Sequence, residues 1–524
     1  MIEAVDPLVI DGYLVRAAER SPNHPAVSDG DRHLTYGKFD ERVTRLARVL
    51  AELGVGYGDR VAMLMDNSIE NAICLFAAPR IGAMAAPINN RLTAAEVAYI
   101  VADLEPVVVV VDAAHLAKLD RIGSNAGVEH IMVVGGGVRS DAVSVAPAIR
   151  SVVSYEECVA AANSDRLVVN IDARDGAFIL YTSGTTGKPK GAVLGHAGYV
   201  ANTLGILHAM RMTSRDELRH IGVPMFHSGG LNSILQQIVL GAPALITEPG
   251  GYAADALVDL WAKHSVFTAF LTPTQWGQVC DVPGVRERNL ALGRLIWGTS
   301  KPPASVLARM QETFPGVPVY ANFGMTETSG TTCSLAPEYA LSKIHTVGRP
   351  VGHIQVRVVG PDLRDVPTGE VGEIVYQGPP VMREYWRNKK ATAEAFTGGW
   401  FHSGDLGRFD EDGFLIVVDR LKDMIVSGGE NIYASEVEAA LVSHPKVAEV
   451  VVVGVPHPKW VETPRAVVVP TDPDDPPSLE ELQDHVRPVL ASYKKPTSLT
   501  IASSLPRNNM GKLLRNKIKD DQSV

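Results

Sequence analysis

The stretch Tyr181-Thr-Ser-Gly-Thr-Thr-Gly-Lys-Pro-Lys-Gly191 concentrates two hydroxyl pairs, three glycines and two lysines in eleven positions. It continues from the apolar run 178–181, so a buried strand that enters a glycine- and hydroxyl-rich turn is expected here. Glycine lets the backbone approach an anion closely, its N–H groups point into the turn, and lysine adds positive charge. The stretch therefore predicts a phosphate-binding loop.

This loop differs from the nucleoside-triphosphate loop G-x-x-x-x-G-K-[ST]. Thr182 stands where the first glycine belongs, and Pro189 follows Lys188 in place of a hydroxyl residue. Proline has no N–H to donate and resists the helical turn that would follow. The pattern indicates a phosphate loop of another type, and an ordinary flexible surface loop is the alternative for this stretch alone.

Length and composition restrict the class of protein. A chain of 524 residues is too long for one core and predicts at least two domains. The net charge of −10 argues against nucleic acid or an anionic membrane as the main partner. Apolar runs such as 107–111 are too short for stable membrane insertion. The cysteines are scattered without C-x-x-C spacing, which favours a reducing cytoplasm.

Hydrophobic periodicity alternates between helix and strand in the first part of the chain. A helical stripe over 39–53 leads to a strand at 60–65, a helix at 69–80 and a strand at 82–88. Thr93-Ala-Ala-Glu96 is a capping box that opens a further helix. This alternation predicts an α/β fold: a large, multi-lobed N-terminal domain whose parallel sheets are covered by helices.

The end of the chain predicts a small α+β unit. Strands are expected at 448–453 and 465–469, with a helix from Ser478. Ser435-x-x-Glu438 is expected to cap another helix.

Six further polar strings follow the phosphate loop. They are Pro224-Met-Phe-His-Ser-Gly-Gly230, Leu295-Ile-Trp-Gly-Thr-Ser-Lys-Pro302, Tyr320-Ala-Asn-Phe-Gly-Met-Thr-Glu-Thr328, Trp400-Phe-His-Ser-Gly-Asp-Leu-Gly407, Asp419-Arg-Leu-Lys-Asp-Met-Ile-Val-Ser-Gly-Gly-Glu-Asn-Ile-Tyr433 and Leu505-Pro-Arg-Asn-Asn-Met-Gly-Lys-Leu-Leu-Arg515. His227 follows an expected strand, where α/β sheets place ligands; alternatively, it holds its own loop. Glu327 is a hard oxygen ligand suited to magnesium. Asp405 can accept two hydroxyls, or simply cap a turn.

In this order, the strings resemble the signature of the adenylate-forming superfamily, which includes acyl- and aryl-CoA synthetases, coumarate–CoA ligases, luciferases and peptide-synthetase adenylation domains. The resemblance covers essentially the whole chain. It implies an AMP-forming acid–CoA ligase that converts a small-molecule carboxylic acid into an acyl adenylate with ATP and Mg²⁺, then transfers the acyl group to coenzyme A. It also implies an N-terminal adenylation domain at 1–420 and a mobile C-terminal domain at 421–524.

The resemblance also implies a role for individual residues. Catalysis falls to Lys512, Thr185, Glu327 and His227, with the metal held by Thr185 and Glu327. The nucleotide is bound by Thr182, Ser183, Gly184, Thr185, Thr186, Gly187, Lys190, Gly298, Asn322, Phe323, Gly324, Thr326, Asp405, Arg420 and Lys512. The acid pocket is formed by His227, Ser228, Gly229, Trp297 and Lys301. CoA is bound by Gly428 and Gly429, and the hinge lies at Lys422.

Three positions depart from the family pattern. Phe323 stands where relatives more often carry tyrosine, 299–301 reads Thr-Ser-Lys in place of Gly-Ala, and Val461 stands where glycine is common. Several alternatives stay open: an adenylating enzyme that serves a carrier protein or an amine, a non-catalytic nucleotide sensor, and a homodimer or monomer. Medium-chain fatty, alicyclic and aryl acids all remain candidate substrates.

Overall fold

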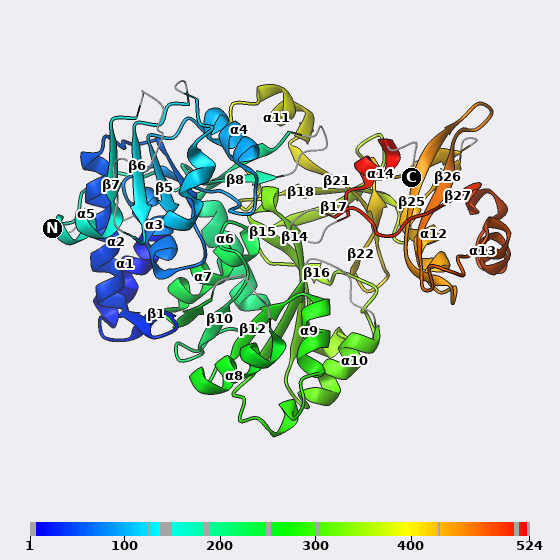
Figure 1. Ribbon diagram of the computed structural model, residues 1–524, viewed down its shortest axis with the longest axis horizontal. Helices are drawn as coiled ribbons and strands as arrows, with labels where there is room; N and C mark the ends of the chain where they lie inside the picture. Colours follow the sequence, from blue (N-terminus) through cyan, green and yellow to red (C-terminus); the bar gives the residue numbers. More distant parts are fainter. Residues whose placement is uncertain are drawn as a thin grey trace. The chain divides into compact units, whose positions relative to one another are not determined.

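The computed structural model describes residues 7–123, 126–136, 149–182, 188–247, 253–298, 304–427, 430–507 and 513–520. The chain divides into two compact units (Figure 1). Unit 1 comprises Met1–Val356 and Tyr376–Phe401, and unit 2 comprises Arg357–Val375 and His402–Val524. Unit 2 thus begins before the boundary expected at 420/421. The boundary expected at 420/421 is the point at which the C-terminal domain should turn about Lys422, and it stays a prediction.

Unit 1 contains an eight-stranded sheet in the order β19-β9-β8-β4-β3-β5-β6-β7. Its strands are β3 (Arg60–Leu64), β4 (Met84–Pro87), β5 (Val108–Asp112), β6 (His130–Val134), β7 (Ser151–Ser154), β8 (Gly176–Thr182), β9 (Lys190–Gly195) and β19 (Glu384–Tyr385). Strands β8, β4, β3, β5, β6 and β7 run parallel to one another, whereas β9 is antiparallel to both β8 and β19. Parallel strands require crossover helices, which explains the alternation seen in the sequence.

The second sheet of unit 1 has nine strands in the order β16-β15-β14-β13-β12-β10-β11-β1-β2. They are β1 (Pro25–Asp29), β2 (Arg32–Thr35), β10 (Arg219–Ile221), β11 (Ala244–Ile246), β12 (Thr268–Leu271), β13 (Arg294–Gly298), β14 (Val319–Met325), β15 (Gly330–Leu335) and β16 (Arg349–Pro350). The central strands are parallel, so their carboxyl ends share one edge.

The helices of unit 1 pack on and between these sheets, with α6 and α7 between them (Figure 1). They are α1 (Ile10–Arg20), α2 (Tyr36–Glu52), α3 (Ile69–Arg80), α4 (Ala94–Leu104), α5 (Tyr155–Ala161), α6 (His196–Ala209), α7 (Ser228–Leu240), α8 (Ala254–His264), α9 (Pro273–Cys280), α10 (Ala304–Thr313) and α11 (Lys389–Ala395). The helix expected at 69–80 and the Thr93–Glu96 capping box are confirmed. Every residue of α3 is buried, so this helix lies in the core and not on the surface.

A five-stranded sheet follows in the chain. It contains β17 (Gln355–Val359), β18 (Gly372–Gln377), β21 (Trp400–Phe409) and β20 (Phe396–Thr397), in that order, with β22 (Leu415–Arg420) paired to β21.

The last sheet, in unit 2, has the order β24-β23-β26-β25 with β27 paired to β26. Its strands are β23 (Ile425–Ser427), β24 (Glu430–Ile432), β25 (Val447–His457), β26 (Val461–Pro470) and β27 (Ser498–Ile501); the helices are α12 (Ala434–Leu441), α13 (Leu479–Val486) and α14 (Arg515–Asp520). Alternate side chains of β25 and β26 face opposite sides of the sheet. One side packs against α12 and α13, and the other packs against Leu505, Leu513 and Ile518. The predicted small α+β unit is therefore present.

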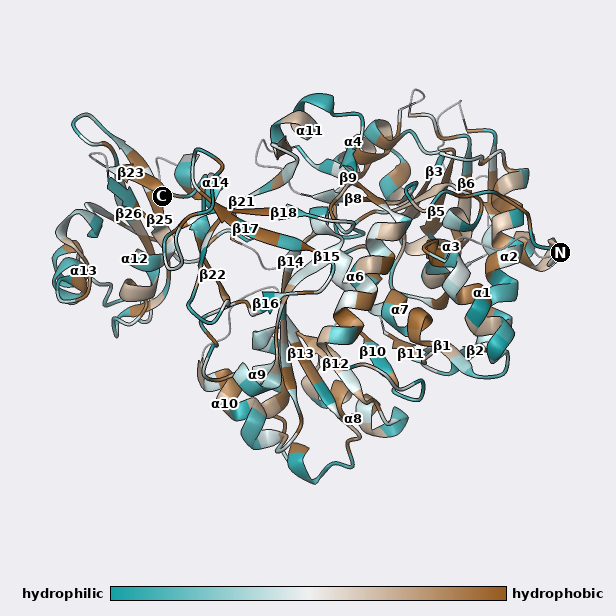
Figure 2. Ribbon diagram, turned by 180° about the vertical axis from the view of Figure 1, so that it is seen from behind, coloured by the Kyte–Doolittle hydropathy of each residue, from teal (hydrophilic) through white to brown (hydrophobic). Residues whose placement is uncertain are grey.

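The predicted fold class is confirmed as mixed α/β, with a large unit and a smaller one. Hydrophobic colour follows the sheet strands in Figure 2, whereas the outer helices carry both colours, as amphipathic helices should. One local prediction is wrong. Ser435 lies inside α12, whose N-terminal cap is Tyr433, so the pair Ser435–Glu438 forms no capping box.

Candidate active site

The two ends of the phosphate loop are held together by a strand pair. β8 ends at Thr182, β9 begins at Lys190, and these two residues are paired across the antiparallel ladder. Gly191 faces Tyr181 there, and a Cβ at Gly191 would come within 2.8 Å of Ile179. Glycine is therefore needed for the close strand contact. Ser183, Gly184, Thr185, Thr186 and Gly187 lie outside the described residues, so their predicted roles stay predictions.

Glu327 lies beside this loop, in a short 3-10 helix, η3 (Thr326–Thr328), with only 7% of its surface exposed. Its Oε1 lies 3.3 Å from the Thr182 hydroxyl and 3.1 Å from the Tyr385 hydroxyl, both of which can donate to it. Burial and the Glu327 charge raise the pKa of Tyr385, so its phenol keeps its proton and donates. Two segments 145 residues apart thus meet at one carboxylate oxygen, and the metal site predicted at Glu327 stays a prediction.

Two asparagines that the sequence analysis missed fix the backbone after Glu327. Ser329 is in the left-handed conformation with φ 56°. The side-chain amide of Asn202 donates to the Thr331 carbonyl at 2.7 Å, and that of Asn232 donates to the Ser329 carbonyl at 2.8 Å. Both asparagines are buried within the largely apolar helices α6 and α7, and a polar residue in that setting is the signal that could have revealed them.

The predicted nucleotide residues of β13 and β14 lie side by side. Gly298 pairs with Asn322, and a Cβ on Gly298 would come within 3.1 Å of the Asn322 carbonyl oxygen. Gly324 lies closer still to its neighbour, since a Cβ there would be 1.7 Å from the Gly330 carbonyl oxygen. Phe323 and Thr326 are half-buried at the same sheet edge. Glycine is therefore required at 324 for strand packing, and a side chain at 298 would be tightly packed.

His227 caps the N-terminus of α7, because its Nδ1 accepts from the Gly229 backbone N–H at 3.2 Å. This contact matches the alternative that the histidine holds its own loop, and it requires Nδ1 to be unprotonated. Asn67, missed by the sequence analysis, fixes the same loop. It donates to the Val223 carbonyl at 2.9 Å and accepts from the Met225 N–H at 2.8 Å.

The other predicted pocket residues are near strand ends or helix starts. Ser228 is buried and Gly229 half-buried in the first turn of α7, and Trp297 is buried in β13. Lys301 lies outside the described residues. The acid pocket itself stays a prediction.

In unit 2, Asp405 and Arg420 face each other across the β21–β22 pair. Arg420 Nε lies 3.0 Å from Asp405 Oδ1, and the aspartate side chain is almost fully buried. The ion pair fixes one carboxylate oxygen of the residue predicted to accept the ribose. Lys422, the predicted hinge, is exposed in the turn after β22, and Gly428 and Gly429 lie outside the described residues.

Lys512 also lies outside the described residues, but both flanks of its segment are anchored. Arg507 and Leu513 form an antiparallel bridge, and the Leu514 N–H donates to the Pro506 carbonyl at 2.9 Å. Arg515 forms a two-pronged contact with a carboxylate of α12.

That carboxylate is Glu438, whose two oxygens accept from Arg515 at 2.6 and 2.7 Å. The same guanidinium donates to the Val452 carbonyl at 2.8 Å. Burial raises the pKa of Glu438, and the Arg515 charge partly offsets this.

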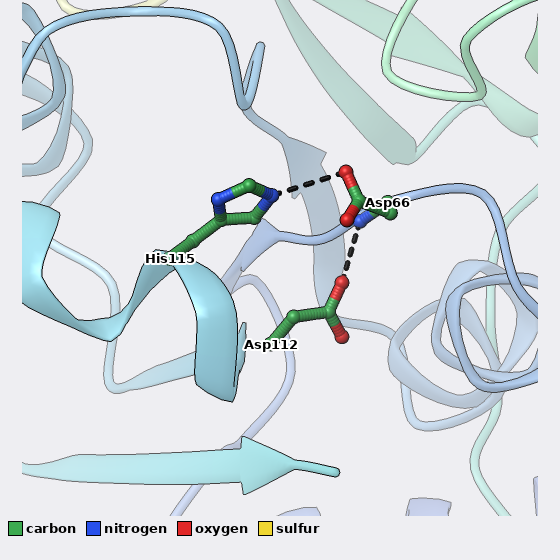
Figure 3. A group of neighbouring side chains, drawn as sticks. All are labelled: Asp66, Asp112 and His115. Atoms are coloured by element: carbon green, nitrogen blue, oxygen red, sulfur yellow. Dashed lines mark hydrogen bonds and ion pairs between the residues drawn. The ribbon is translucent and has the colours of Figure 1, made fainter. Parts of the chain in front are cut away.

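A second group of ligand-type side chains lies elsewhere in unit 1. Figure 3 shows Asp66, Asp112 and His115, whose ligand atoms all lie within 4.8 Å of one another. His115 Nε2 is 3.0 Å from Asp66 Oδ1, and Asp112 accepts from the Asp66 backbone N–H at 2.6 Å. Burial raises the pKa of Asp112 to about 6. The contacts join the loop after β3 to the end of β5 and to the 3-10 helix that follows it (Ala113–Leu119), which accounts for the group structurally.

Comparison with known proteins identifies the family. The model of the AMP-binding enzyme family matches residues 14–386, and that of the AMP-binding enzyme C-terminal domain matches 436–512. The chain belongs to this family.

Feruloyl-CoA synthase from Amycolatopsis sp is 35% identical over 511 residues, covering 97% of this chain and 98% of that protein. A long-chain-fatty-acid–CoA ligase from Mycobacterium tuberculosis is 33% identical, covering 94% of each chain. The structure of o-succinylbenzoate CoA synthetase from Bacillus subtilis with its acyl-adenylate intermediate is similar with a TM-score of 0.80 and 28% identity, covering 97% of this chain and 98% of that one. The resemblance stated from the sequence is confirmed.

Proposed function

We propose that this chain is an AMP-forming acid–CoA ligase whose adenylation step is organised around Glu327 and the adjoining phosphate loop. The class of the enzyme is confirmed, because CoA ligases match over nearly their full length. ATP and CoA are accordingly its co-substrates, and a carboxylic acid is its substrate. The observation that carries the proposed mechanism is the convergence of Thr182 and Tyr385 on the Glu327 carboxylate.

The residues around Glu327 fit a magnesium ion. A carboxylate oxygen is a hard ligand of the kind that magnesium prefers. Both hydrogen bonds to the carboxylate fall on Oε1, and within the described part of the chain none is found on Oε2. Thr185 is the proposed second ligand. When bound, the ion would neutralise charge on the triphosphate.

The proposed chemistry has two half-reactions. In the first, the carboxylate of the acid substrate attacks the α-phosphorus of ATP, and pyrophosphate leaves. The phosphate loop binds the negative charge of the pyrophosphate, and Lys512 contacts the acid and the α-phosphate. In the second, the C-terminal domain turns about Lys422 and presents Gly428 and Gly429 to CoA, whose thiol attacks the acyl adenylate to release AMP. Asp405 holds the ribose.

Replacing Lys512 with alanine tests this division of labour. Pyrophosphate exchange should fall by about 10²–10³-fold, since one stabilising donor is lost, whereas thioester formation from a supplied acyl adenylate should be largely retained. Lys519→Ala is the matched control, because this lysine follows in the same segment and pairs with Glu462 at 3.0 Å. Equal loss of both half-reactions in Lys512→Ala would contradict the alternating mechanism.

The acid is best identified by measuring pyrophosphate release over a panel of aryl, alicyclic and fatty acids. In the same panel, AMP release without CoA would reveal an enzyme that serves another acceptor. No pyrophosphate exchange with any acid would favour a nucleotide sensor. Among the described residues, no helix is long and apolar enough to cross a membrane. A cytoplasmic location and a homodimer stay predictions.

A further inference from the structure

We propose that Tyr385 is a positioning residue that holds the Glu327 carboxylate in the orientation required for magnesium. This inference rests on the proposed function, because it assigns a partner to the proposed metal ligand. Tyr385 lies in β19, 58 residues from Glu327, and was not singled out by any sequence motif.

Tyr385 and Thr182 both contact the same oxygen of the Glu327 carboxylate. The Tyr385 hydroxyl lies 3.1 Å from Glu327 Oε1, and the Thr182 hydroxyl lies 3.3 Å from the same atom. Both donors therefore engage Oε1, and among the described residues no hydrogen bond is found on Oε2. A carboxylate that is held in this way is fixed in rotation, and its second oxygen is directed to one place.

Backbone hydrogen bonds fix the position of Tyr385 independently of its side chain. β19 pairs with β9, with Tyr385 opposite Ala192. The Trp386 N–H donates to the Gly191 carbonyl at 2.7 Å, and the Met382 N–H donates to the Glu327 carbonyl at 2.7 Å. The short segment 382–386 is thus bonded both to the strand that leaves the phosphate loop and to the turn that carries Glu327.

The aromatic ring of Tyr385 makes a second contact, with Lys190. Lys190 Nζ lies 5.0 Å from the centroid of the Tyr385 ring, within the range of a cation–π contact. Tyr385 itself is 9% exposed, so both contacts are made by a nearly buried side chain. One aromatic residue therefore orients the proposed metal ligand through its hydroxyl and a loop lysine through its face.

These two roles predict separable effects. Tyr385→Phe removes the hydroxyl and keeps the ring, so it should weaken magnesium binding while leaving metal-free ATP binding unchanged. Loss of such a supporting hydrogen bond commonly costs about 10- to 100-fold in metal affinity. Tyr385→Leu also removes the ring and should additionally weaken ATP binding in the absence of magnesium.

The experiment measures the unfolding temperature of the full-length protein with ATP over a magnesium series, with no acid present so that no turnover occurs. Ligand binding to the folded state raises this temperature, so the series gives an apparent magnesium dissociation constant. Tyr36→Phe is the matched control, because Tyr36 is a buried tyrosine whose hydroxyl donates to the Ala242 carbonyl at 2.9 Å and not to Glu327. The expected result is an increase of about tenfold or more for Tyr385→Phe and no change for Tyr36→Phe.

Glu327→Gln separates the two levels of the argument. If it leaves the magnesium dependence unchanged, the proposed metal site is wrong. If it removes the dependence but Tyr385→Phe retains the wild-type constant, only the inference about Tyr385 is overturned. An equal shift in Tyr36→Phe and Tyr385→Phe would also overturn it, because the effect would then follow from the loss of any buried tyrosine hydroxyl. Should Tyr385→Leu fail to fold, Tyr385→Phe decides alone.

Discussion

Replacing Glu438 with glutamine should loosen the segment that carries Lys512. Glu438 accepts from both terminal nitrogens of Arg515, at 2.6 and 2.7 Å, and Arg515 lies three positions after the lysine. The pair connects this segment to α12. Glutamine keeps the shape of the side chain but offers one acceptor and no charge, so the two-pronged contact is lost.

The stability cost follows from the burial of the pair. Breaking a buried ion pair costs about 3–5 kcal/mol, but these side chains are 18% and 21% exposed. Arg515 also keeps its bond to the Val452 carbonyl. Because burial raises the pKa of Glu438 despite Arg515, the charge on Glu438 is not fully compensated. We therefore expect a loss of about 1–2 kcal/mol in the free energy of unfolding.

The catalytic cost should be larger than the stability cost. Misplacement of a catalytic group by about 1 Å can cost about 10²-fold in rate. Pyrophosphate exchange should therefore fall by about 10- to 100-fold, whereas thioester formation from a supplied acyl adenylate, which does not use Lys512 in the proposed mechanism, should be retained.

Glu436→Gln is the matched control. Glu436 lies on the same helix and pairs with Lys494 at 2.7 Å, away from the Lys512 segment. Glu436→Gln should lose no more stability than Glu438→Gln, measured as the urea midpoint, because Glu436 is 39% exposed in its ion pair, and only Glu438→Gln should slow adenylation selectively. The reasoning is refuted if Glu438→Gln slows both half-reactions equally, or if Glu436→Gln shows the same selective loss.

Two other predictions concern stability. The pKa of Asp112 in the folded protein, about 6, is above its ordinary value of 3.8. The folded protein therefore binds this proton more tightly than the unfolded chain does, and it loses stability as pH rises from about 4 to about 6. Asp112→Asn should therefore be about 1–2 kcal/mol more stable than the wild type at pH 7, after allowance for partial exposure, and the gain should vanish near pH 4 in urea unfolding; a gain that is constant with pH would disprove this origin. Val461 has φ 72°, a left-handed conformation that costs a β-branched residue about 1–2 kcal/mol. Val461→Gly should raise the free energy of unfolding by about 1 kcal/mol, seen as a higher urea midpoint. A lower midpoint would show that the turn is not strained.

Much of the local structure could be predicted from the sequence. The helix at Ile69–Arg80 is predicted from hydrophobic periodicity with its observed bounds. Val461, marked from the sequence as a departure from the family pattern, has a positive φ, a conformation that glycine adopts without strain. The Ser435–Glu438 capping box was wrong, since a local pattern cannot reveal that Glu438 is engaged by Arg515 instead.

The sequence by itself determined the order of the elements, the family, and the residue types available for phosphate, metal and ribose binding. It did so because helical and strand periods, turn glycines and short motifs are all local properties of the chain. Only the tertiary structure decided that Tyr385 and Thr182 meet at Glu327, and that Arg515 meets Glu438. Contacts across 58, 145 and 77 residues depend on strand order and register, which local periods do not specify.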